Sequence, residues 1–266
     1  MSTVPVSDTP PSPESMPFVA PCRTLEMSAP LRWLRLGWSD MKRAPRLSLT
    51  YGLALMALSV AIAAFTWKFG TMALYIGMAT GFIFVGPVLA VGLYSISRQL
   101  GKGLEPVMGY CLREGKYHVK ELLVLGMILM VVLLVWARAA AMVHVFFPAE
   151  GTPGWKQLLP FLAIGSVVGS VFAAIVFATS AFSLPMILDR KVDAITASVT
   201  SINAVLRNKK PMIVWASLIA LSVILGFATA FIGFIVLLPL IGHATWHAYQ
   251  ETIDAAAWPL DSVENT

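Results

Sequence analysis

Residues 158–188 of this chain read LLPFLAIGSVVGSVFAAIVFATSAFSLPMIL. This stretch contains no charged side chain, and it is longer than the roughly 20 apolar residues that a helix needs to cross a hydrocarbon core of about 30 Å. Similar stretches lie at about residues 48–67, 72–96, 121–146, 212–229 and 232–249. Because their interiors carry almost no charge and no Asp or Glu, the sequence predicts an all-α membrane protein with six transmembrane helices.

The composition of the chain agrees with this prediction. Of its 266 residues, 58% are hydrophobic and only 12% are charged, whereas a soluble domain carries about 25% charged residues. The net charge of +5 does not point to nucleic acid, because the basic residues recur at the ends of the apolar stretches instead of forming one patch. We expect a disordered cytoplasmic tail at 1–27, a membrane domain at 28–250 and a cytoplasmic tail at 251–266, with no signal peptide.

The positions of Lys and Arg predict the orientation of the spans. Six basic residues lie before the first span, five lie in the connection 98–120, and five lie in the connection 189–210. The opposite side holds only Lys68 and Lys156 outside the spans. Since the excess of Lys and Arg marks the cytoplasmic side, both termini are expected in the cytoplasm. Cys22 and Cys111 then lie on the reducing side, so no disulfide is expected.

The sequence also indicates three parallel repeats, each of an interfacial amphipathic helix followed by a helical hairpin. The second span of each repeat carries a proline near its cytoplasmic end, and two of these spans carry two glycines four residues apart, which lets helix backbones approach closely. Spans of all three repeats run in the same sense, so the repeat is not inverted. The residues predicted to pack helices are Gly77, Gly81, Gly165, Gly169, Pro87, Pro185 and Pro239.

Each proposed interfacial helix combines an apolar stripe with a basic end. Leu31, Leu34, Trp38 and Met41 share one helical face, and the stripe of Ile195, Val199, Ile202 and Leu206 is similar. This pattern favours a helix lying flat at anionic headgroups, although packing against the bundle would give the same stripe. We expect Trp33, Trp38, Trp215 and Trp246 near the inner interface. The predicted lipid-interface residues are Arg32, Arg35, Lys42, Arg43, Arg113, Lys116, Arg207, Lys209 and Lys210.

Few side chains of this chain are of a type and spacing that could catalyse a reaction or bind a cofactor. His243 and His247 stand four apart on one helical face, a spacing that can bind a metal or haem. No carboxylate or Cys lies on that face to complete a site, so we interpret them as polar residues anchoring the last span at the interface. The sequence shows no phosphate-binding loop, catalytic triad order or HExxH helix. We therefore expect no catalytic residue, no metal, no cofactor and no enzymatic activity.

Several strings resemble a bacterial integral-membrane family of unknown function. They are SAPLRWL with GWSD at 28–40, GPVLAVGLY at 86–94, LPMILDR at 184–190 and LLPLIGHATWHAY at 237–249. The resemblance covers about residues 28–250, and the last string is the most specific. Some members of that family are labelled cytochrome c oxidase subunit I. That enzyme is a twelve-span protein with several histidines deep in its helices, so the label does not suit this chain. The resemblance implies the bacterial inner membrane and no defined activity.

Two functional classes remain open from the sequence. The first is a non-enzymatic lipid-interface or membrane-assembly role, with membrane lipids as partners and basic residues bound to anionic headgroups. The second is a transporter or channel for a neutral or amphipathic solute, lined by the second spans of the repeats. Haem or metal binding at His243 and His247 is a weaker third possibility. The missing intramembrane carboxylates argue against a proton-coupled pump.

Overall fold

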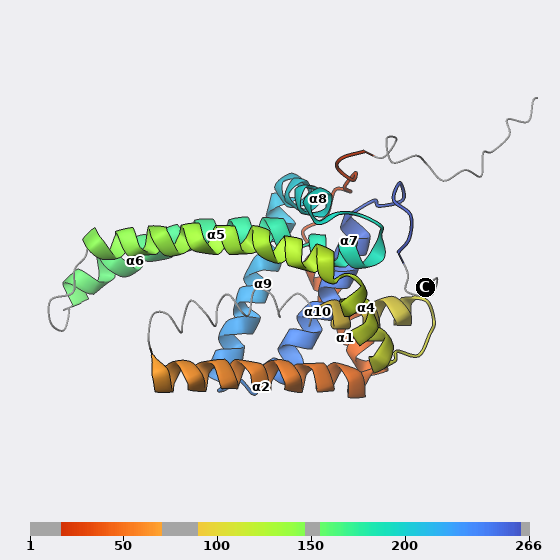
Figure 1. Cartoon of the computed structure of the whole chain (residues 1–266), viewed down its shortest axis with the longest axis horizontal. Helices are drawn as coiled ribbons and strands as arrows, with labels where there is room; N and C mark the ends of the chain where they lie inside the picture. The colour runs from red at the N-terminus through yellow and green to blue at the C-terminus, as the bar shows by residue number, and fades with distance from the viewer. Residues whose placement is uncertain (1–16, 71–89, 147–154, 262–266) are drawn as a thin grey trace, which may run out of the picture.

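A computed structural model of the chain describes residues 17–70, 90–146 and 155–261. In this part the protein is built from helices joined by short connections (Figure 1). Residues 90–101 are also helical. The helices are α1 (Ala29–Arg43), α2 (Pro45–Phe69), α4 (Met108–Tyr117), α5 (Val119–Phe146), α6 (Trp155–Ser180), α7 (Ser183–Asp189), α8 (Ala194–Arg207), α9 (Lys209–Ala228) and α10 (Phe234–Thr252).

Four helical stretches in this part of the chain are long and apolar enough to cross a membrane. They are Pro45–Phe69, Val119–Met142, Leu159–Asp189 and Lys209–Ala228, which correspond to the first, third, fourth and fifth predicted spans. Most of the predicted second span lies outside the described residues. The predicted sixth span corresponds to α10, which is not among the four, because its second half carries polar side chains such as His243, His247 and Glu251.

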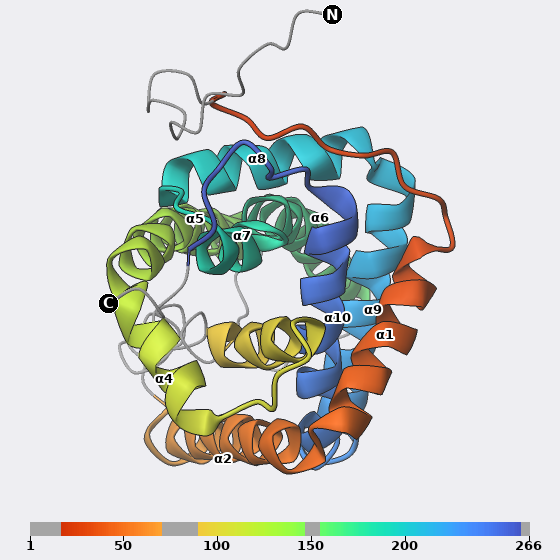
Figure 2. The same ribbon diagram turned by 90° about the vertical axis from the view of Figure 1, so that its right-hand side faces the viewer.

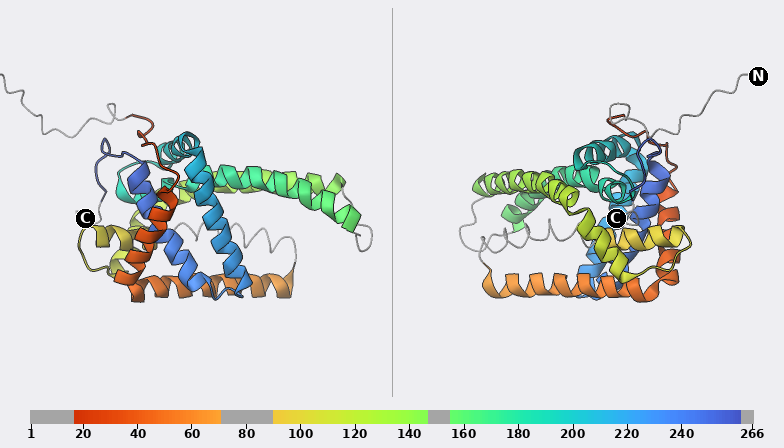
Figure 3. Two further views of the ribbon diagram at one scale, coloured as in Figure 1. Left: turned by 180° about the vertical axis from the view of Figure 1, so that it is seen from behind. Right: turned by 45° about the vertical axis from the view of Figure 1, so that its right-hand side comes forward.

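Helices α2, α5 and α6 extend in the same direction from one end of the molecule (Figure 1). That end contains α1, the helical segment 90–101, α4, α7, α8, the second half of α10 and residues 253–261, and we call it the basic end. Figure 2 looks onto it and shows α10 between α1 and the segment 90–101. Figure 3 shows from behind that α9 runs from α8 toward α2. The α9–α10 pair therefore crosses the direction of α2, α5 and α6.

Local sequence signals set where these helices begin. Pro30 lies in the first turn of α1, and Pro45 opens α2, positions at which proline loses no helical hydrogen bond. Lys42 and Arg43 occupy the last turn of α1, where cations interact favourably with the helix dipole. The side chain of Asp193 caps α8 by accepting hydrogen bonds from Ile195 N and Thr196 N, both at 2.9 Å. Partial burial alone would raise the pKa of Asp193, but these bonds hold it below its ordinary value.

Large aromatic side chains form the core of the basic end. Trp33 of α1 meets Trp215 of α9 edge-on, with ring centroids 5.5 Å apart, and both are buried. Trp246 and Tyr249 of α10 are buried beside them in the same hydrophobic cluster. The expectation that Trp33, Trp215 and Trp246 line the membrane interface is wrong for these three residues, because other helices of the chain cover them. Only Trp38 of that group is exposed.

The two tails are more ordered than the sequence predicts. Ala20 is fully buried, and its backbone N–H donates to Thr200 Oγ1 of α8 at 3.1 Å. Leu25 N donates to Asn208 Oδ1, and Arg23 N donates to Thr252 O. In the C-terminal segment, Trp258 is buried. The expected disordered tail at 1–27 is therefore wrong for residues 20–25, because Thr200 of α8, Asn208 directly after it and the backbone of α10 supply partners that a hydropathy pattern does not reveal.

Candidate functional site: the basic end

The basic residues predicted to meet lipid are solvent-exposed at the basic end. Most of them lie within or next to α1, α4, α8 or the start of α9, which puts them at the base of the long apolar helices (Figure 2). Arg138 and Lys68 lie away from this end, far along α5 and α2. The exposed predicted residues are Arg32, Arg35, Lys42, Arg43, Arg113, Lys116, Arg207, Lys209 and Lys210.

The acidic residues of the same end behave differently, because many of them turn inward. Asp40 and Glu114 are buried, and Asp189 and Glu251 are half-buried with basic or aromatic partners. Of the carboxylates at this end that the structure describes, only Glu26, Glu105 and Asp193 are exposed. The exposed charge at this end is therefore mostly positive.

Glu251 holds the two ends of the membrane domain together. Its carboxylate accepts hydrogen bonds from the guanidinium of Arg32 and from the indole Nε1 of Trp33, the latter at 2.8 Å. Partial burial alone would raise the pKa of Glu251, but the hydrogen bonds from Arg32 and Trp33 and the charge of Arg32 hold it below its ordinary value. Arg32 is therefore a surface cation that also links α1 to α10 through Glu251, and the sequence did not reveal this second role.

His243 is a buried link between three helices. Its Nε2 lies 2.9 Å from Ser48 Oγ of α2, and its Nδ1 lies 2.8 Å from Ser97 Oγ of the segment 90–101. Ser48 Oγ donates to Ala44 O, so it accepts from His243 Nε2–H, and Ser97 donates to Nδ1. Both nitrogens of a neutral imidazole are thereby used. The interfacial anchor expected from the sequence is wrong for this residue, and no nitrogen of His243 remains to ligate iron or another metal.

His247 makes a different contact one turn later. Its Nε2 lies 2.8 Å from Oδ2 of the buried Asp40 of α1. Arg43 also approaches Asp40, at 3.8 Å. The two histidines that the sequence paired as a candidate site therefore serve two separate helix contacts, α10 with α2 and α10 with α1. The sequence could not reveal these partners, because the serines that bond His243 and the carboxylate that bonds His247 stand at no fixed sequence spacing from the two histidines.

A second buried polar cluster joins the segment 90–101, α4 and the C-terminal segment. The guanidinium of Arg98 forms an ion pair with Glu114 and donates to Leu188 O at 2.6 Å. It also donates to Asp261 O at 3.1 Å. His118 donates through Nδ1 to Glu114 O, while its Nε2 faces Asp261 Oδ2 at 3.5 Å. This cluster was not predicted, because Arg98 and Glu114 read in the sequence only as loop charges.

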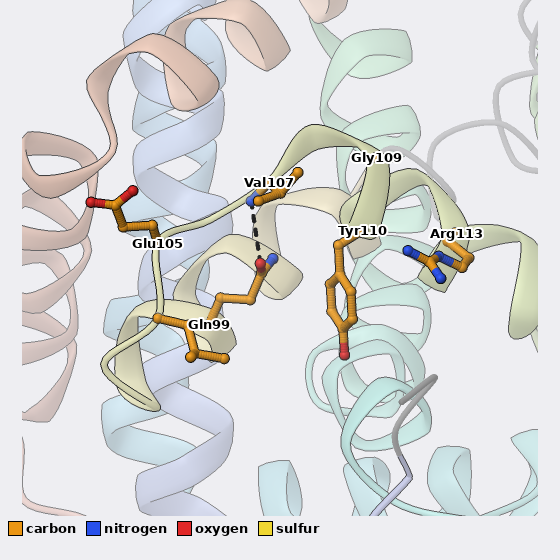
Figure 4. Close-up of a pocket in the computed structure, with 7 residues that line it drawn as sticks. Gln99, Glu105, Val107, Gly109, Tyr110 and Arg113 are labelled. Atoms are coloured by element: carbon orange, nitrogen blue, oxygen red, sulfur yellow. Dashed lines mark hydrogen bonds between the residues drawn. The ribbon is translucent and has the colours of Figure 1, made fainter. Parts of the chain in front are cut away.

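A small pocket opens beside this cluster (Figure 4). It has a volume of about 380 Å³, and its lining residues are Gln99, Leu104, Glu105, Val107, Gly109, Tyr110 and Arg113. Gln99 is buried, and its Oε1 accepts from Val107 N at 3.2 Å, so its amide shapes the loop wall instead of facing a ligand. Arg113 lies at the far side of the pocket from Glu105. The two charged residues of its lining, Glu105 and Arg113, therefore do not converge on one point.

The two predicted interfacial stripes are placed differently from each other. On α1, Leu31 and Trp38 are exposed, whereas Trp33, Gly37 and Met41 face the bundle. On α8, small and polar residues such as Ala197, Ser201 and Ala204 face the bundle. Ile195 and Leu206 of its apolar stripe are exposed, with Val199 and Ile202 half-buried between them. Helix α8 therefore presents much of its apolar stripe outward, as a helix at a lipid interface does.

The close helix contacts occur at glycines other than those predicted. A Cβ built at Gly165 or Gly169 would meet no described atom within 4 Å, so the expected close packing at these two is wrong for the described part of the chain. Gly169 instead lines an apolar hollow of about 410 Å³ between α5 and α6. The backbone of Ile235 lies against Gly52, and a Cβ at Gly242 would stand 2.7 Å from Leu93 Cδ1.

The prolines predicted to occupy equivalent positions lie in different structural environments. Pro185 is buried in the first turn of the short helix α7, where the chain has left α6. Pro239 is buried within α10. Gly77, Gly81 and Pro87 lie outside the described residues, so nothing here bears on their contacts.

The comparison with known proteins agrees with the membrane character of this fold. Residues 74–189 match a family described as "Predicted integral membrane protein (DUF2189)". The match carries no cytochrome c oxidase label, and it ends before the stretch 237–249. No curated protein and no solved structure matches the chain. The chain is an integral membrane protein with several membrane-spanning helices, and its residues 74–189 are similar to a membrane family of unknown function.

Proposed function

We propose that this protein is a non-enzymatic membrane-interface protein whose basic end binds anionic lipid headgroups and organises the membrane around it. The observation that carries the proposal is the sorting of charge at the basic end. Carboxylates such as Asp40 and Glu114 are buried in helix contacts, whereas Arg35, Lys42 and Lys116 remain exposed at the base of the apolar helices. Each exposed Lys or Arg near an anionic surface contributes about 1 kcal/mol.

The outward face of α8 supports the same function. Ile195 and Leu206 are exposed next to Arg207 at the helix end. An apolar face that lies in the acyl boundary with a basic rim at the headgroups gains from both the hydrophobic effect and charge attraction. If this face of α8 lay in water, the exposed Ile195 and Leu206 would not be stabilised by the hydrophobic effect, and the neighbouring basic residues would have no anionic surface to attract them.

The proposal places the protein in a bacterial inner membrane, with six spans in three parallel repeats and both termini in the cytoplasm. Support comes from the common placement of the three basic-rich segments at one end of the described structure. Reporter fusions at Thr266 and near Gly154 test this topology. They should report opposite compartments, and a reporter at Thr266 that reads outside would refute it.

Lipid retention tests the function directly. The full chain is purified in mild detergent and titrated with phosphatidylglycerol or phosphatidylcholine, and bound lipid is counted by native mass spectrometry. The double variant Arg35→Glu with Lys42→Glu should retain fewer phosphatidylglycerol molecules and leave phosphatidylcholine unchanged. Lys68→Glu is the matched control, because Lys68 is also exposed but lies at the opposite end of α2.

Two results would contradict the proposal. Equal loss of lipid in Lys68→Glu and in the double variant would show that any surface charge matters alike. Unchanged retention in both would remove the basic end as a lipid-binding surface. Transport of a neutral solute in reconstituted vesicles would then favour the solute-pathway class.

A further inference from the structure

We propose that the groove between α6 and α9 is a specific site for one anionic phospholipid, with an acyl chain in the groove and the headgroup phosphate at Lys209. This inference rests on the proposed function and names the lipid site within it. The groove has a volume of about 790 Å³ and is walled by α6, the end of α8 and the first half of α9. A volume in this range is typical of small-molecule sites, which are mostly apolar with a few placed polar groups.

The walls of the groove suit a hydrocarbon chain. Small residues such as Ala174 and Ala216 line it, with Phe177 and Met212 nearer α8. Its two serines do not make it polar. Ser170 Oγ donates to Ser166 O at 2.7 Å, and Ser217 Oγ donates to Ile213 O at 2.9 Å, so each hydroxyl is used by its own helix. Lys209 is the one charged side chain in the lining.

The positive charge at the α8 end of the groove has no internal partner. Lys209, Lys210 and Arg207 are exposed, and none forms an ion pair or a side-chain hydrogen bond with a carboxylate among the residues that the structure describes. Lys209 is also the first residue of the 20-residue helix α9, whose N-terminus has no side-chain cap. Lys209 in the lining and the positive end of the α9 dipole therefore lie together at this end of the groove, with Arg207 and Lys210 exposed next to Lys209 in the chain, which suits a phosphate.

The shape of the groove favours a lipid over a helix of a second copy. The C-terminal end of α6 packs against α8, and α9 begins directly after α8, so the two helices run apart from α8 and leave a wedge between them (Figures 1 and 3). A flexible chain can follow such a wedge. A straight helix packs closely against a neighbouring helix only near their crossing point, at an interaxial distance of about 8–10 Å, so it would leave the wider part of the wedge unfilled.

The test uses the full chain in detergent and native mass spectrometry with phosphatidylglycerol. Ala216→Trp fills the groove and should abolish the most tightly retained lipid. Leu221→Trp is the matched control, because Leu221 is exposed on α9 but does not line the groove. Lys209→Ala should weaken the binding of phosphatidylglycerol about fivefold, the equivalent of ~1 kcal/mol, and leave the binding of phosphatidylcholine unchanged. Glycerol phosphate and inorganic phosphate should not displace the lipid.

The following results would refute the proposed lipid site in the groove. Full retention in Ala216→Trp, or displacement by inorganic phosphate alone, would show that the acyl chain does not occupy the groove. A change of oligomeric mass in Ala216→Trp with unchanged lipid would show that a second copy fills it. The two proposals remain separable. Loss of lipid in Ala216→Trp with no effect of Arg35→Glu and Lys42→Glu would keep the groove and refute the wider basic surface.

Discussion

Gly37 of α1 lies directly against the backbone of Ala244 of α10. A methyl group added at Gly37 would stand 2.7 Å from Ala244 N and 3.0 Å from Leu240 O. Both atoms belong to the backbone of α10, which lies between α1 and the segment 90–101 and packs against Leu93 of that segment at Gly242, so they have little room to move. The α1–α10 crossing therefore depends on a residue without a side chain at this position.

We expect Gly37→Ala to destabilise the protein by about 1–3 kcal/mol, because an extra carbon must push two helices apart. Gly169→Ala is the matched control, since a methyl group there meets no described atom within 4 Å. The control should leave stability unchanged or raise it slightly, as replacing a helical glycine usually does. Thermal unfolding in detergent measures both. Equal effects of the two changes would contradict the close crossing.

Ser97→Ala should cost about 1–3 kcal/mol, because it leaves Nδ1 of the buried His243 without a hydrogen bond. Ser59→Ala on α2 is a suitable control, since Ser59 Oγ donates only to Leu55 O of its own helix. The control should change the unfolding midpoint little. If both serines behave alike, His243 does not depend on Ser97.

The ion pair of Arg98 and Glu114 predicts a strongly non-additive pair of mutations. Arg98→Met should destabilise the protein by about 3–5 kcal/mol, because it leaves the buried carboxylate of Glu114 without its charge partner. Adding Glu114→Leu should restore much of the lost stability, since no buried charge then remains unpaired. A double-mutant cycle from unfolding measurements gives the coupling. Additive effects would show that the two charges do not depend on each other.

The lowered pKa of Glu251 predicts that the folded protein loses stability in acid. Its folded-state pKa is lower than its ordinary value of about 4.3, so the Glu251 contribution is complete above that value and is lost as the pH falls through the folded-state pKa. Glu251→Gln should therefore lower the unfolding midpoint near neutral pH and flatten its decline in acid. Glu26→Gln changes an exposed carboxylate 3.8 Å from Arg32 and should keep the wild-type slope. An unchanged slope in Glu251→Gln would refute the prediction.

The membrane class and the positions of four apolar helices could be predicted from the amino-acid sequence alone. Residues 48–67, 121–146, 158–188 and 212–229 all lie within or largely overlap helical stretches able to cross a membrane. These features are local, because transfer of a helical segment into hydrocarbon depends on the composition of that segment alone. The basic segments that were predicted to share one side also lie at one end of the described structure.

Which helix faces are buried and which polar residues pair could not be predicted from the sequence and became visible only in the folded chain. Trp33 and Trp38 are equally apolar in the sequence, yet Trp33 is enclosed by α9 and Glu251, and Trp38 is exposed. His243 meets Ser97, 146 residues earlier, and Arg32 meets Glu251, 219 residues later. A helical stripe shows that one face is apolar but not which neighbour reaches it. That choice depends on backbone approach, as at Gly37 and Ala244, and such long-range contacts have no periodic signal in the chain.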